Sequence, residues 1–526
     1  MRASIRGGAG LALVGAGRAA ARHGWGSLLH RLRALFVIAC ALAWGIPAWS
    51  APAQALGPQV ALGTPRGGYL GRIALQPQRA AVGARVEVRA SGLPPAERFE
   101  LVWTTAVGRW NASNGVYRGR TYAPVAYRIG EPVSDQAGNL LAQFVVPEDF
   151  GFEHDVVLQQ GGRLFTKAGF DIEMTVELSP TQGPPGTPIT VDVKGIGWRQ
   201  MENSWLLLYD NRFTGWMSAV STHGSARFTI PAAGRPGAHV LEVLHGDFTF
   251  PYRNMQQSPA PDRPQFVRTF TVTDGPAVLP PPPGSQSLAQ PRIPVATGAL
   301  TTTPAFSVVG QPIRIEGSGF VPGSTHEIRW KTVSGNRVGG SGWVEQTRSL
   351  GQARADAAGR LRLDLATPDD LGGEHAIEVQ DGALVRTGTH SILPSAAALD
   401  VARGPAGTPF RIHLKGVGWT ETANIYTLVY DNAYIGYGCG FNSQGDAEFT
   451  LYASGEPGWH FIDLYPSIYK GSEDRPINFR LPQLTADRDH PGEDLPRFRF
   501  AFEVTEGAAV LPPAARAGST ATTRRP

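Results

Sequence analysis

Four histidines are the side chains in this sequence whose type and spacing first suggest chemistry. His154 and His375 stand in Gly-x-Glu-His, and His239 and His460 stand in Pro-Gly-x-His. If each lies in its own strand-built domain, they are tens of ångströms apart and cannot share a metal. A residue just after a glycine turn, at the start of a sandwich strand, often bonds back to the preceding loop instead. We therefore interpret the four histidines as structural, with a titratable site as the alternative.

Two groups of acidic residues invite a cation-binding interpretation. Each Tyr-Asp-Asn triplet, at 209–211 and 430–432, offers a single carboxylate, whereas calcium needs several oxygen ligands. Asp-Asn is typical of a hairpin turn, which is the interpretation adopted here. A second group lacks the regular spacing of a calcium loop and is expected to be a solvated loop; it comprises Asp487, Asp489, Glu493 and Asp494.

Catalytic signatures are missing from the sequence. It contains no Gly-x-Ser-x-Gly, His-Glu-x-x-His, Cys-x-x-Cys, phosphate loop or dinucleotide-binding glycines. We therefore predict no catalytic residues, no cofactor, no metal and no enzymatic activity. A hydrolase with accessory domains stays an alternative, because a pair of catalytic carboxylates can be hundreds of residues apart.

Two stretches combine aromatic rings with arginine and so suggest binding. Tyr, Trp and Arg are the favoured contact residues of interfaces, and binding residues concentrate on loops. The candidate ligand-binding residues are Arg109, Trp110, Tyr117, Arg118, Arg120 and Tyr122 in the first stretch, and Tyr252, Arg253, Tyr469, Phe479 and Arg480 in the two versions of the second. The alternative is that these aromatics cap the ends of their own domains.

A duplication provides the frame that must position these residues. Residues 183–215 and 404–436 align without a gap, with 15 of 33 positions identical and a spacing of 221 residues. Alternating apolar side chains at 188–194 predict a half-buried strand. The Gly-x-Gly-Trp that follows predicts a turn whose tryptophan, Trp198 or Trp419, covers the core.

The copies differ in length at two places, and both fall on the aromatic stretches. The first copy has six extra residues between Trp103 and Gly138, and the second has eleven extra residues between the last two strands of its second domain. A loop gains residues at little cost in closure entropy. We therefore expect partner recognition to belong to these two loops and not to the repeated strands.

The Pro/Gly start, apolar strand, Gly-x-Gly-aromatic turn and later Gly-x-His strand resemble the IPT/TIG-like immunoglobulin modules of bacterial exported proteins. The resemblance covers residues from about 72 to 512. It implies an all-β chain of four immunoglobulin-like β-sandwich domains, arranged as a duplicated two-domain unit. The expected domains are 72–173, 174–280, 300–395 and 396–512. These motifs specify a fold far better than a function.

Composition agrees with several small β domains and excludes some partners. The 526 residues include 64 Gly and 43 Pro, and only 17% are charged. The first 50 residues hold six arginines and no acid, and beyond them 42 basic side chains meet 44 acidic ones. This balance gives no electrostatic case for nucleic acid. The two cysteines, Cys40 and Cys439, form no disulfide framework.

The N-terminal region reads as a secretory signal peptide. Arg31 and Arg33 precede an apolar run at 34–46, and small residues follow. Cleavage is expected after Ser50 or Ala55, and no membrane span is expected in the mature chain. An uncleaved anchor is the alternative, although the run is shorter than about 18 residues. The basic lead is unusually long, and a translation start further downstream is a second alternative.

The remaining segments connect or end the domains. Residues 51–71 and the proline-rich 281–299 are expected to be linkers, and 513–526 a disordered tail. The sequence thus predicts an exported, non-enzymatic protein of the periplasm, cell surface or medium. We expect it to bind a protein or glycan in adhesion or recognition. The alternative is a structural spacer or assembly subunit without a ligand of its own.

Overall fold

The computed structural model describes residues 55–113, 116–247, 250–258, 260, 262–286, 299–336, 342–469, 480–492 and 494–510. The predicted signal peptide, most of the linker at 281–299, Phe479, Glu493 and the C-terminal tail lie outside these residues. Within the described parts, every regular element is a β-strand except three 3₁₀ turns, η1 (Met255–Gln257), η2 (Pro283–Ser285) and η3 (Phe441–Ser443). A search of the same residues for helices long and apolar enough to cross a membrane found none.

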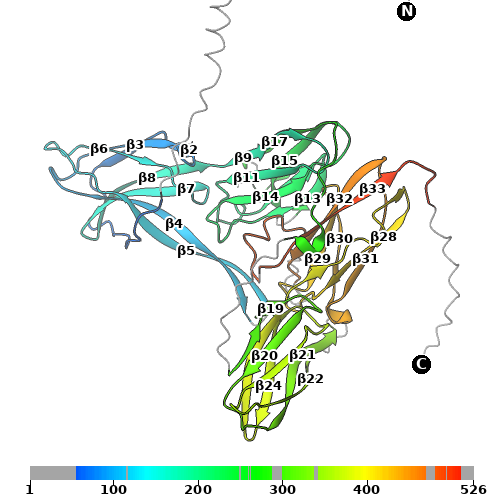
Figure 1. The fold of residues 1–526 in the computed structure, drawn as a ribbon. Helices are drawn as coiled ribbons and strands as arrows, with labels where there is room; N and C mark the ends of the chain where they lie inside the picture. Colours follow the sequence, from blue (N-terminus) through cyan, green and yellow to red (C-terminus); the bar gives the residue numbers. More distant parts are fainter. Residues whose placement is uncertain are drawn as a thin grey trace, which may run out of the picture. The chain divides into compact units, whose positions relative to one another are not determined.

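The first eight strands form two sheets that face each other as a sandwich, called sandwich 1 (Figure 1). One sheet has the order β1-β3-β6 and the other β2-β8-β7-β4-β5. All pairs are antiparallel except β2 with β8. The strands are β1 (Arg72–Gln76), β2 (Arg79–Ala81), β3 (Arg85–Ser91), β4 (Glu100–Ser113), β5 (Val116–Gly130), β6 (Leu140–Val145), β7 (Phe152–Gln160) and β8 (Arg163–Glu173).

The same strand order recurs three times along the chain. Sandwich 2 consists of β9 (Thr175–Ser179), β10 (Gln182–Gly183), β11 (Pro188–Lys194), β12 (Trp205–Tyr209), β13 (Arg212–Met217), β14 (Ala226–Pro231), β15 (Gly237–Asp247), β16 (Phe250–Pro251) and β17 (Phe266–Val272). Sandwich 3 consists of β18 (Leu300–Thr303), β19 (Phe306–Ser307), β20 (Pro312–Gly317), β21 (Thr325–Asn336), β22 (Gly342–Arg354), β23 (Leu361–Ala366), β24 (Gly373–Asp381) and β25 (Leu384–Ile392). Sandwich 4 consists of β26 (Ser395–Ala396), β27 (Arg403–Pro405), β28 (Pro409–Lys415), β29 (Ile425–Tyr430), β30 (Ala433–Cys439), β31 (Ala447–Tyr452), β32 (Gly458–Ser467) and β33 (Phe498–Thr505).

This order identifies an immunoglobulin-like fold. In the usual lettering, each sandwich pairs an A-B-E sheet with an A′-G-F-C-C′ sheet, and the short A′ strand runs parallel to G. The chain is therefore all-β and built of repeated immunoglobulin-like sandwiches. The predicted domain boundaries stay predictions.

Alternation along the strands explains why these segments fold in this way. In β3, Val86 and Val88 are fully buried while Arg85 and Arg89 face solvent, the period of two expected of a strand with one buried face. The largest fully buried side chains include Trp103 in β4 and the equivalent Trp330 in β21. Each sandwich thus has its own apolar core between its two sheets.

The Pro-x-Asp that precedes each Gly-x-Glu-His has a definite role in these cores. The Asp149 carboxylate is completely buried and accepts hydrogen bonds from Trp103 Nε1 at 2.8 Å and from Thr105 Oγ1 at 3.0 Å. Asp370 accepts the same two bonds from Trp330 and Thr332. Because a buried carboxylate is costly unless its oxygens are bonded, the aspartate and the tryptophan depend on each other.

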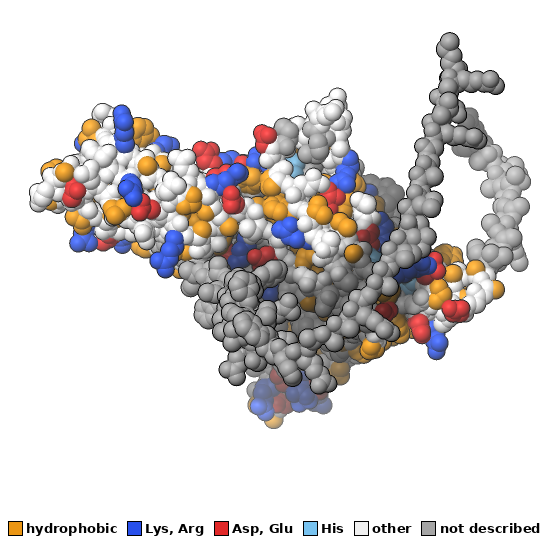
Figure 2. All heavy atoms as spheres, turned by 90° about the horizontal axis from the view of Figure 1, so that it is seen from above, with side chains coloured by type: hydrophobic (Ala, Val, Ile, Leu, Met, Phe, Trp, Pro, Cys, Tyr) orange, Lys and Arg blue, Asp and Glu red, His pale blue; other side chains and the backbone are white. Residues whose placement is uncertain are grey.

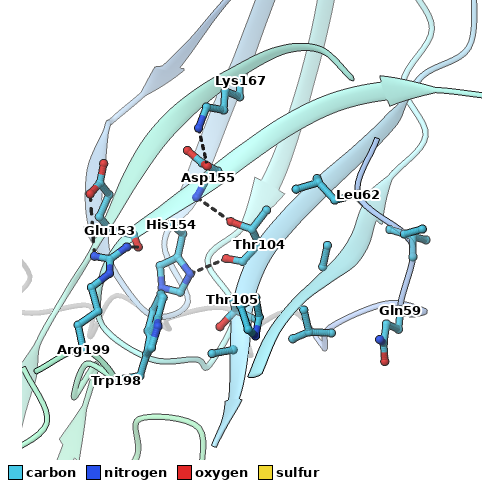
Figure 3. A pocket seen from close by; sticks show the side chains of 16 residues that line it. Gln59, Leu62, Thr104, Thr105, Glu153, His154, Asp155, Lys167, Trp198 and Arg199 are labelled. Atoms are coloured by element: carbon cyan, nitrogen blue, oxygen red, sulfur yellow. Dashed lines mark hydrogen bonds and ion pairs between the residues drawn. The ribbon is translucent and has the colours of Figure 1, made fainter. Parts of the chain in front are cut away.

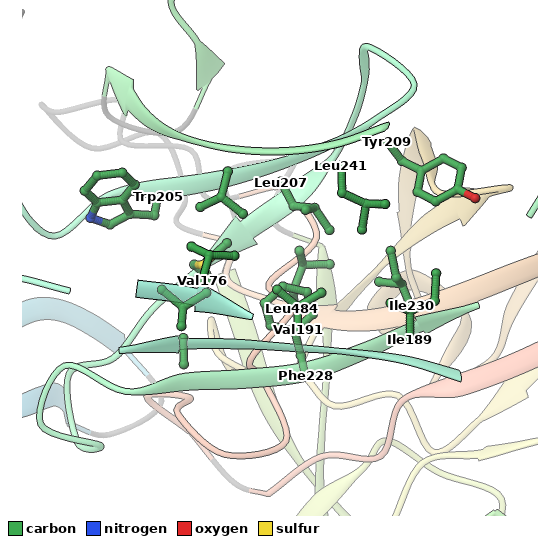
Figure 4. Packing of buried hydrophobic residues seen from close by; sticks show 14 of the residues in the cluster. Val176, Ile189, Val191, Trp205, Leu207, Tyr209, Phe228, Ile230, Leu241 and Leu484 are labelled. Carbon is green, nitrogen blue, oxygen red and sulfur yellow. The ribbon is translucent and has the colours of Figure 1, made fainter. Parts of the chain in front are cut away.

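The core of sandwich 2 is not filled by its own strands alone. Figure 4 shows Leu484 among Val191, Leu207 and Phe228, although Leu484 belongs to the segment between β32 and β33 of sandwich 4. Tyr465 of β32 also belongs to this cluster of buried side chains. Side chains of sandwich 4 therefore complete the core of sandwich 2, while the core of sandwich 4 itself is a separate cluster.

The expectation that Trp198 and Trp419 cover the cores of their own domains is wrong. Both are only half-buried. Trp198 packs across the junction with sandwich 1, where its ring lies 5.0 Å from the His154 ring and 5.7 Å from Phe150. Trp419 packs 5.9 Å from Trp343 of sandwich 3. The repeated Gly-x-Gly-Trp is a junction between sandwiches, because the turn directs the ring outward.

We predict that Trp103→Ala costs about 3 to 5 kcal/mol of stability, through the lost burial and the cavity that remains. Trp198→Ala is expected to cost clearly less, because its side chain is already partly exposed before the change. Chemical denaturation of both variants measures the difference. Equal losses would mean that Trp198 belongs to a core after all.

Candidate functional site

The four histidines hold the ends of their own strands, as the sequence predicts. One ring nitrogen of each lies 2.7 or 2.8 Å from the carbonyl oxygen four residues earlier. The other nitrogen faces a strand carbonyl for His154 and His375, and an aspartate carboxylate for His239 and His460. Each ring also stacks on a neighbouring aromatic side chain.

The Tyr-Asp-Asn triplets are the hairpin turns that the sequence predicts. Asp210 and Asn211 have φ of 49° and 63°, and Asp431 and Asn432 have 46° and 59°. Positive φ at both central residues defines the tight turn that matches the twist of the flanking strands. Asp431 also accepts a bond from the Phe461 amide and one from His460, so a single carboxylate holds both the turn and the next strand.

The first length-variable stretch is not a loop, which corrects the sequence prediction. Residues 104–113 and 116–126 continue β4 and β5 as one paired ribbon, which Figure 1 shows running beyond the other strands of its sheet. Strand β4 pairs with β7 only from Glu100 to Trp103. The extra residues therefore lengthen a hairpin, called here the C–C′ ribbon (residues 104–113 and 116–126).

The far part of the C–C′ ribbon contacts other sandwiches. Arg120 donates 2.6 and 3.2 Å bonds to the side chain and carbonyl of Asn203 in sandwich 2. The Tyr117 amide donates a 2.8 Å bond to the Glu421 carboxylate of sandwich 4. Tyr117 is only 3% exposed, and burial raises the pKa of its hydroxyl to about 12. The aromatic and arginine side chains on this ribbon thus act largely within the chain.

The expectation that the acidic group at 487–494 forms a solvated loop is wrong for Asp489. This side chain is 1% exposed, and its carboxylate accepts bonds from Trp110 Nε1 at 2.8 Å, the Val220 amide at 2.7 Å and the Ser221 amide at 2.9 Å. Asp487, two residues earlier, is exposed as predicted. Asp489 therefore connects the C–C′ ribbon, sandwich 2 and sandwich 4 at one point.

The described part of the second length-variable segment, residues 480–492, lies against sandwich 2. Two backbone hydrogen bonds join it to Trp216. The Leu484 amide donates to the Trp216 carbonyl, and the Trp216 amide donates to the Pro482 carbonyl. Ser218, fully buried, bonds Thr485 and the Asp489 carbonyl. Its counterpart in the other copy, Cys439, is exposed. The two segments in which the copies differ in length therefore meet each other inside the chain.

The other candidate residues are more scattered. Arg109 and Arg118 are exposed on the ribbon, and Tyr122 packs edge-on against Phe150. The exposed Arg253 pairs with Glu242, and Tyr252 is its half-buried neighbour. Arg480 stacks 4.1 Å from the Tyr469 ring. The structure does not bring the ten described residues of this set together in one site, and a ligand-binding role for the set stays a prediction.

A pocket of about 650 Å³ lies at the junction of sandwiches 1 and 2. Figure 3 shows Gln59 and Leu62 on one side, Trp198 and Arg199 on the other, and Thr104 and His154 between them. The floor is the place where β4 separates from β7, and there the Thr104 hydroxyl accepts a 3.0 Å bond from the Asp155 amide. Small ligands bind in concave sites of this kind, at boundaries between domains among others.

Residues before β1 build one wall of this pocket. The Val60 amide donates to the Ala126 carbonyl at 2.9 Å, and the Arg128 amide donates to the Pro58 carbonyl at 3.0 Å. Val60 also packs on a small apolar cluster with Val157. The stretch expected to be a linker, 51–71, is therefore partly built into sandwich 1.

Charged side chains in the pocket occur in balanced pairs. Lys167 Nζ donates a 2.8 Å bond to Asp155, and this bond raises the pKa of Lys167. Arg199 donates to the Glu153 carbonyl at 3.0 Å, and its guanidinium lies 4.8 Å from the Trp198 ring. Burial lowers the pKa of His154, which therefore adds no charge at neutral pH. The lining carries two cations and two anions.

Most of this chemistry is specific to the first copy. At a spacing of 221 residues, Asp155 corresponds to Ala376 and Arg199 to Thr420, while Glu153 corresponds to Glu374. Lys167 is paired with Val157 in sandwich 1. The residue aligned with Val157 in the second copy is Glu378, which pairs with Thr387, so Thr387 takes the place of Lys167. The sequence analysis missed these residues because it compared the lengths of the two copies. A comparison of the side-chain types at aligned positions would have identified them.

No cluster of three or more His, Cys, Asp or Glu in the described part of the chain is arranged to hold a metal ion.

We predict that Asp489→Ala costs about 3 kcal/mol or more, because three donors, among them the buried Val220 amide, lose a charged acceptor at once. Thermal unfolding measures the loss, and small-angle X-ray scattering should show a larger particle if sandwiches 2 and 4 separate. Asp487→Ala is the matched control and should change neither. Similar melting curves for the two variants would refute the role given to Asp489.

We also predict a pH-dependent contribution from His460. Burial alone would lower its pKa, but the bond to Asp431, the negative charge of that carboxylate and the bond to the Glu456 carbonyl together raise it. The stabilisation, about 1.5 to 3 kcal/mol for a charged hydrogen bond, is therefore complete below the unfolded pKa of about 6.5. It is lost as the pH rises through the folded pKa. The stability difference between wild type and His460→Phe should shrink over that range, whereas a constant difference would contradict the assignment.

Comparisons with known proteins place the chain in no family. No protein-family model and no curated protein matches it. Three of the solved structures that align are E. coli alpha-2-macroglobulin (12% identity, 81% of this chain and 30% of that chain, TM-score 0.17), an ICAM-5 ectodomain fragment (13%, 82% and 99%, 0.16) and invasin, a bacterial integrin-binding protein (10%, 86% and 79%, 0.14). The chain thus spans less than a third of the macroglobulin. TM-scores this low carry no argument, so the immunoglobulin-like fold rests on the strand order itself.

Proposed function

We propose that this chain is an exported, non-enzymatic recognition protein of the IPT/TIG type, which binds a partner outside the cytoplasm through the pocket at the junction of sandwiches 1 and 2. Export is supported by the Arg-flanked apolar run and the small residues at 47–55. Periplasm, cell surface and medium are all compatible with it. The partner is a protein or a glycan of that environment.

The observation that carries this proposal is the difference between the two copies at the pocket. A duplicated fold keeps its core residues because packing demands them, whereas a charged set present in one copy alone serves no common structural need. Lys167, Asp155 and Arg199 form such a set. Its 650 Å³ volume lies within the range of ligand sites in proteins, about 300 to 1,000 Å³.

The charge distribution argues against polyanionic partners. Figure 2 shows lysine and arginine side chains interspersed with aspartate and glutamate over the visible face, without a large area of one sign. Steering of nucleic acid or other polyanions needs a continuous basic surface.

A structural spacer or assembly subunit is the second candidate, and one observation favours it. The aromatic segments in which binding was expected instead connect the copies to each other through Trp110, Tyr117 and Asp489. Buried aromatics of this kind serve rigidity. A rigid frame and a binding pocket are compatible. The spacer is therefore favoured over the recognition protein only if the pocket binds no partner.

We predict that Ala61→Trp, which fills the pocket from its exposed rim, reduces retention of the partner at least tenfold without lowering the melting temperature. The measurement is capture of envelope proteins and polysaccharides by the immobilised full chain. Ala357→Trp, at an exposed site in sandwich 3, is the control. Equal retention by both variants would remove the pocket from the proposed function, and no retention by the wild type would favour the spacer.

A further inference from the structure

The pocket between sandwiches 1 and 2 has a chemistry that selects its ligand. We infer that it binds a short, uncharged saccharide. This inference rests on the proposed function and narrows it to one class of partner.

The balance of charge is the first argument. Two cations and two anions line the pocket, and Lys167 with Asp155 already form a 2.8 Å pair. A phosphate, sulfate or acidic peptide would have to displace a carboxylate that is held in place. A sugar hydroxyl donates one hydrogen bond and accepts others. It can therefore lie between an ammonium and a carboxylate without changing the net charge.

The polar groups are also suited to neighbouring hydroxyls. Gln59 supplies an amide, which both donates and accepts, while Glu153 supplies an acceptor and Arg199 a planar set of donors. Gln59 and Arg199 lie on opposite walls in Figure 3. A ligand between the walls would meet hydrogen-bond donors and acceptors on both sides. The neighbouring hydroxyls of a sugar need both kinds of partner.

Apolar contact is available at the rim without forming a deep apolar hole. Leu62 is 47% exposed on one wall, whereas on the other wall the Arg199 guanidinium covers the Trp198 ring, which also packs against His154. The Leu62 surface suits the C–H face of a sugar ring. This apolar rim is too small and too shallow for the large apolar anchor residues on which protein interfaces depend.

A peptide partner meets a further obstacle. An extended peptide usually adds to a free strand edge through backbone hydrogen bonds. The edge of β5 beside this pocket is already paired, since Ala126 and Arg128 bond the segment at 58–60. The pocket therefore offers side chains rather than an open strand edge.

The experiment is a glycan array probed with the purified full chain. The array carries neutral oligosaccharides of glucose, mannose, galactose and N-acetylglucosamine, together with sulfated and sialylated ones. Titration calorimetry on the best neutral ligand then compares wild type with a Gln59→Ala/Glu153→Ala double variant. Both side chains lie at the rim, and the exposed Glu153 makes only a 3.9 Å ion pair, so folding should be unaffected. The matched control in the second copy is Glu374→Ala/Gln352→Ala.

The expected result is binding of neutral saccharides, weakened at least tenfold by the rim variant and unchanged by the control. Binding restricted to sulfated or sialylated glycans would overturn the inference. So would neutral-saccharide binding that the rim variant leaves intact. Capture of a protein that Ala61→Trp abolishes, with no saccharide bound, would overturn the saccharide and leave the proposed function standing. If the wild type bound no saccharide and captured no protein, the proposed function would be overturned as well.

Discussion

The rest of the arrangement depends on one buried carboxylate, that of Asp489. Its oxygens accept bonds from the Trp110 indole, two amides of sandwich 2 and the Ser221 hydroxyl, while its own backbone belongs to sandwich 4. A buried anion is costly unless donors surround it. The carboxylate is therefore fully hydrogen-bonded only when three parts of the chain meet, namely the C–C′ ribbon, sandwich 2 and the segment at 480–492.

The duplication explains why this contact is possible and why it is unequal. Each pair of sandwiches uses the same junction, in which the amide of Gly151 or Gly372 donates to a carbonyl inside the Gly-x-Gly-Trp turn of the next sandwich. The first pair lengthened its C–C′ hairpin, and the second lengthened the segment before its last strand. Ser218 is covered by the second insertion, whereas the aligned Cys439 is exposed. The two insertions contact each other through Trp110 and Asp489. Because each insertion occurs in one copy only, the chain makes this contact once.

The pocket and this contact use the same ribbon. Thr104 and Thr105 line the pocket at the base of the ribbon, and Trp110 and Tyr117 connect its far part to sandwich 4. The contacts that hold the ribbon therefore also hold one side of the pocket. The spacer and binding hypotheses differ in whether this pocket has a ligand.

Sequence alone determined the features that depend on local patterns. Alternation at 188–194, the Asp-Asn turns and the glycine before each histidine identified the strands, the hairpins and the role of His154 and its equivalents, because these depend on residues that are near in sequence or follow strand periodicity. Whether an insertion is a free loop or a docked one depends on which surfaces face it. The sequence therefore placed Asp489 in solvent and Trp198 in a core, and only the tertiary structure showed a buried acceptor and a junction. The pocket was missed for the same reason: its walls, Gln59, Lys167 and Arg199, are far apart in the chain, and only the packing of two sandwiches brings them together.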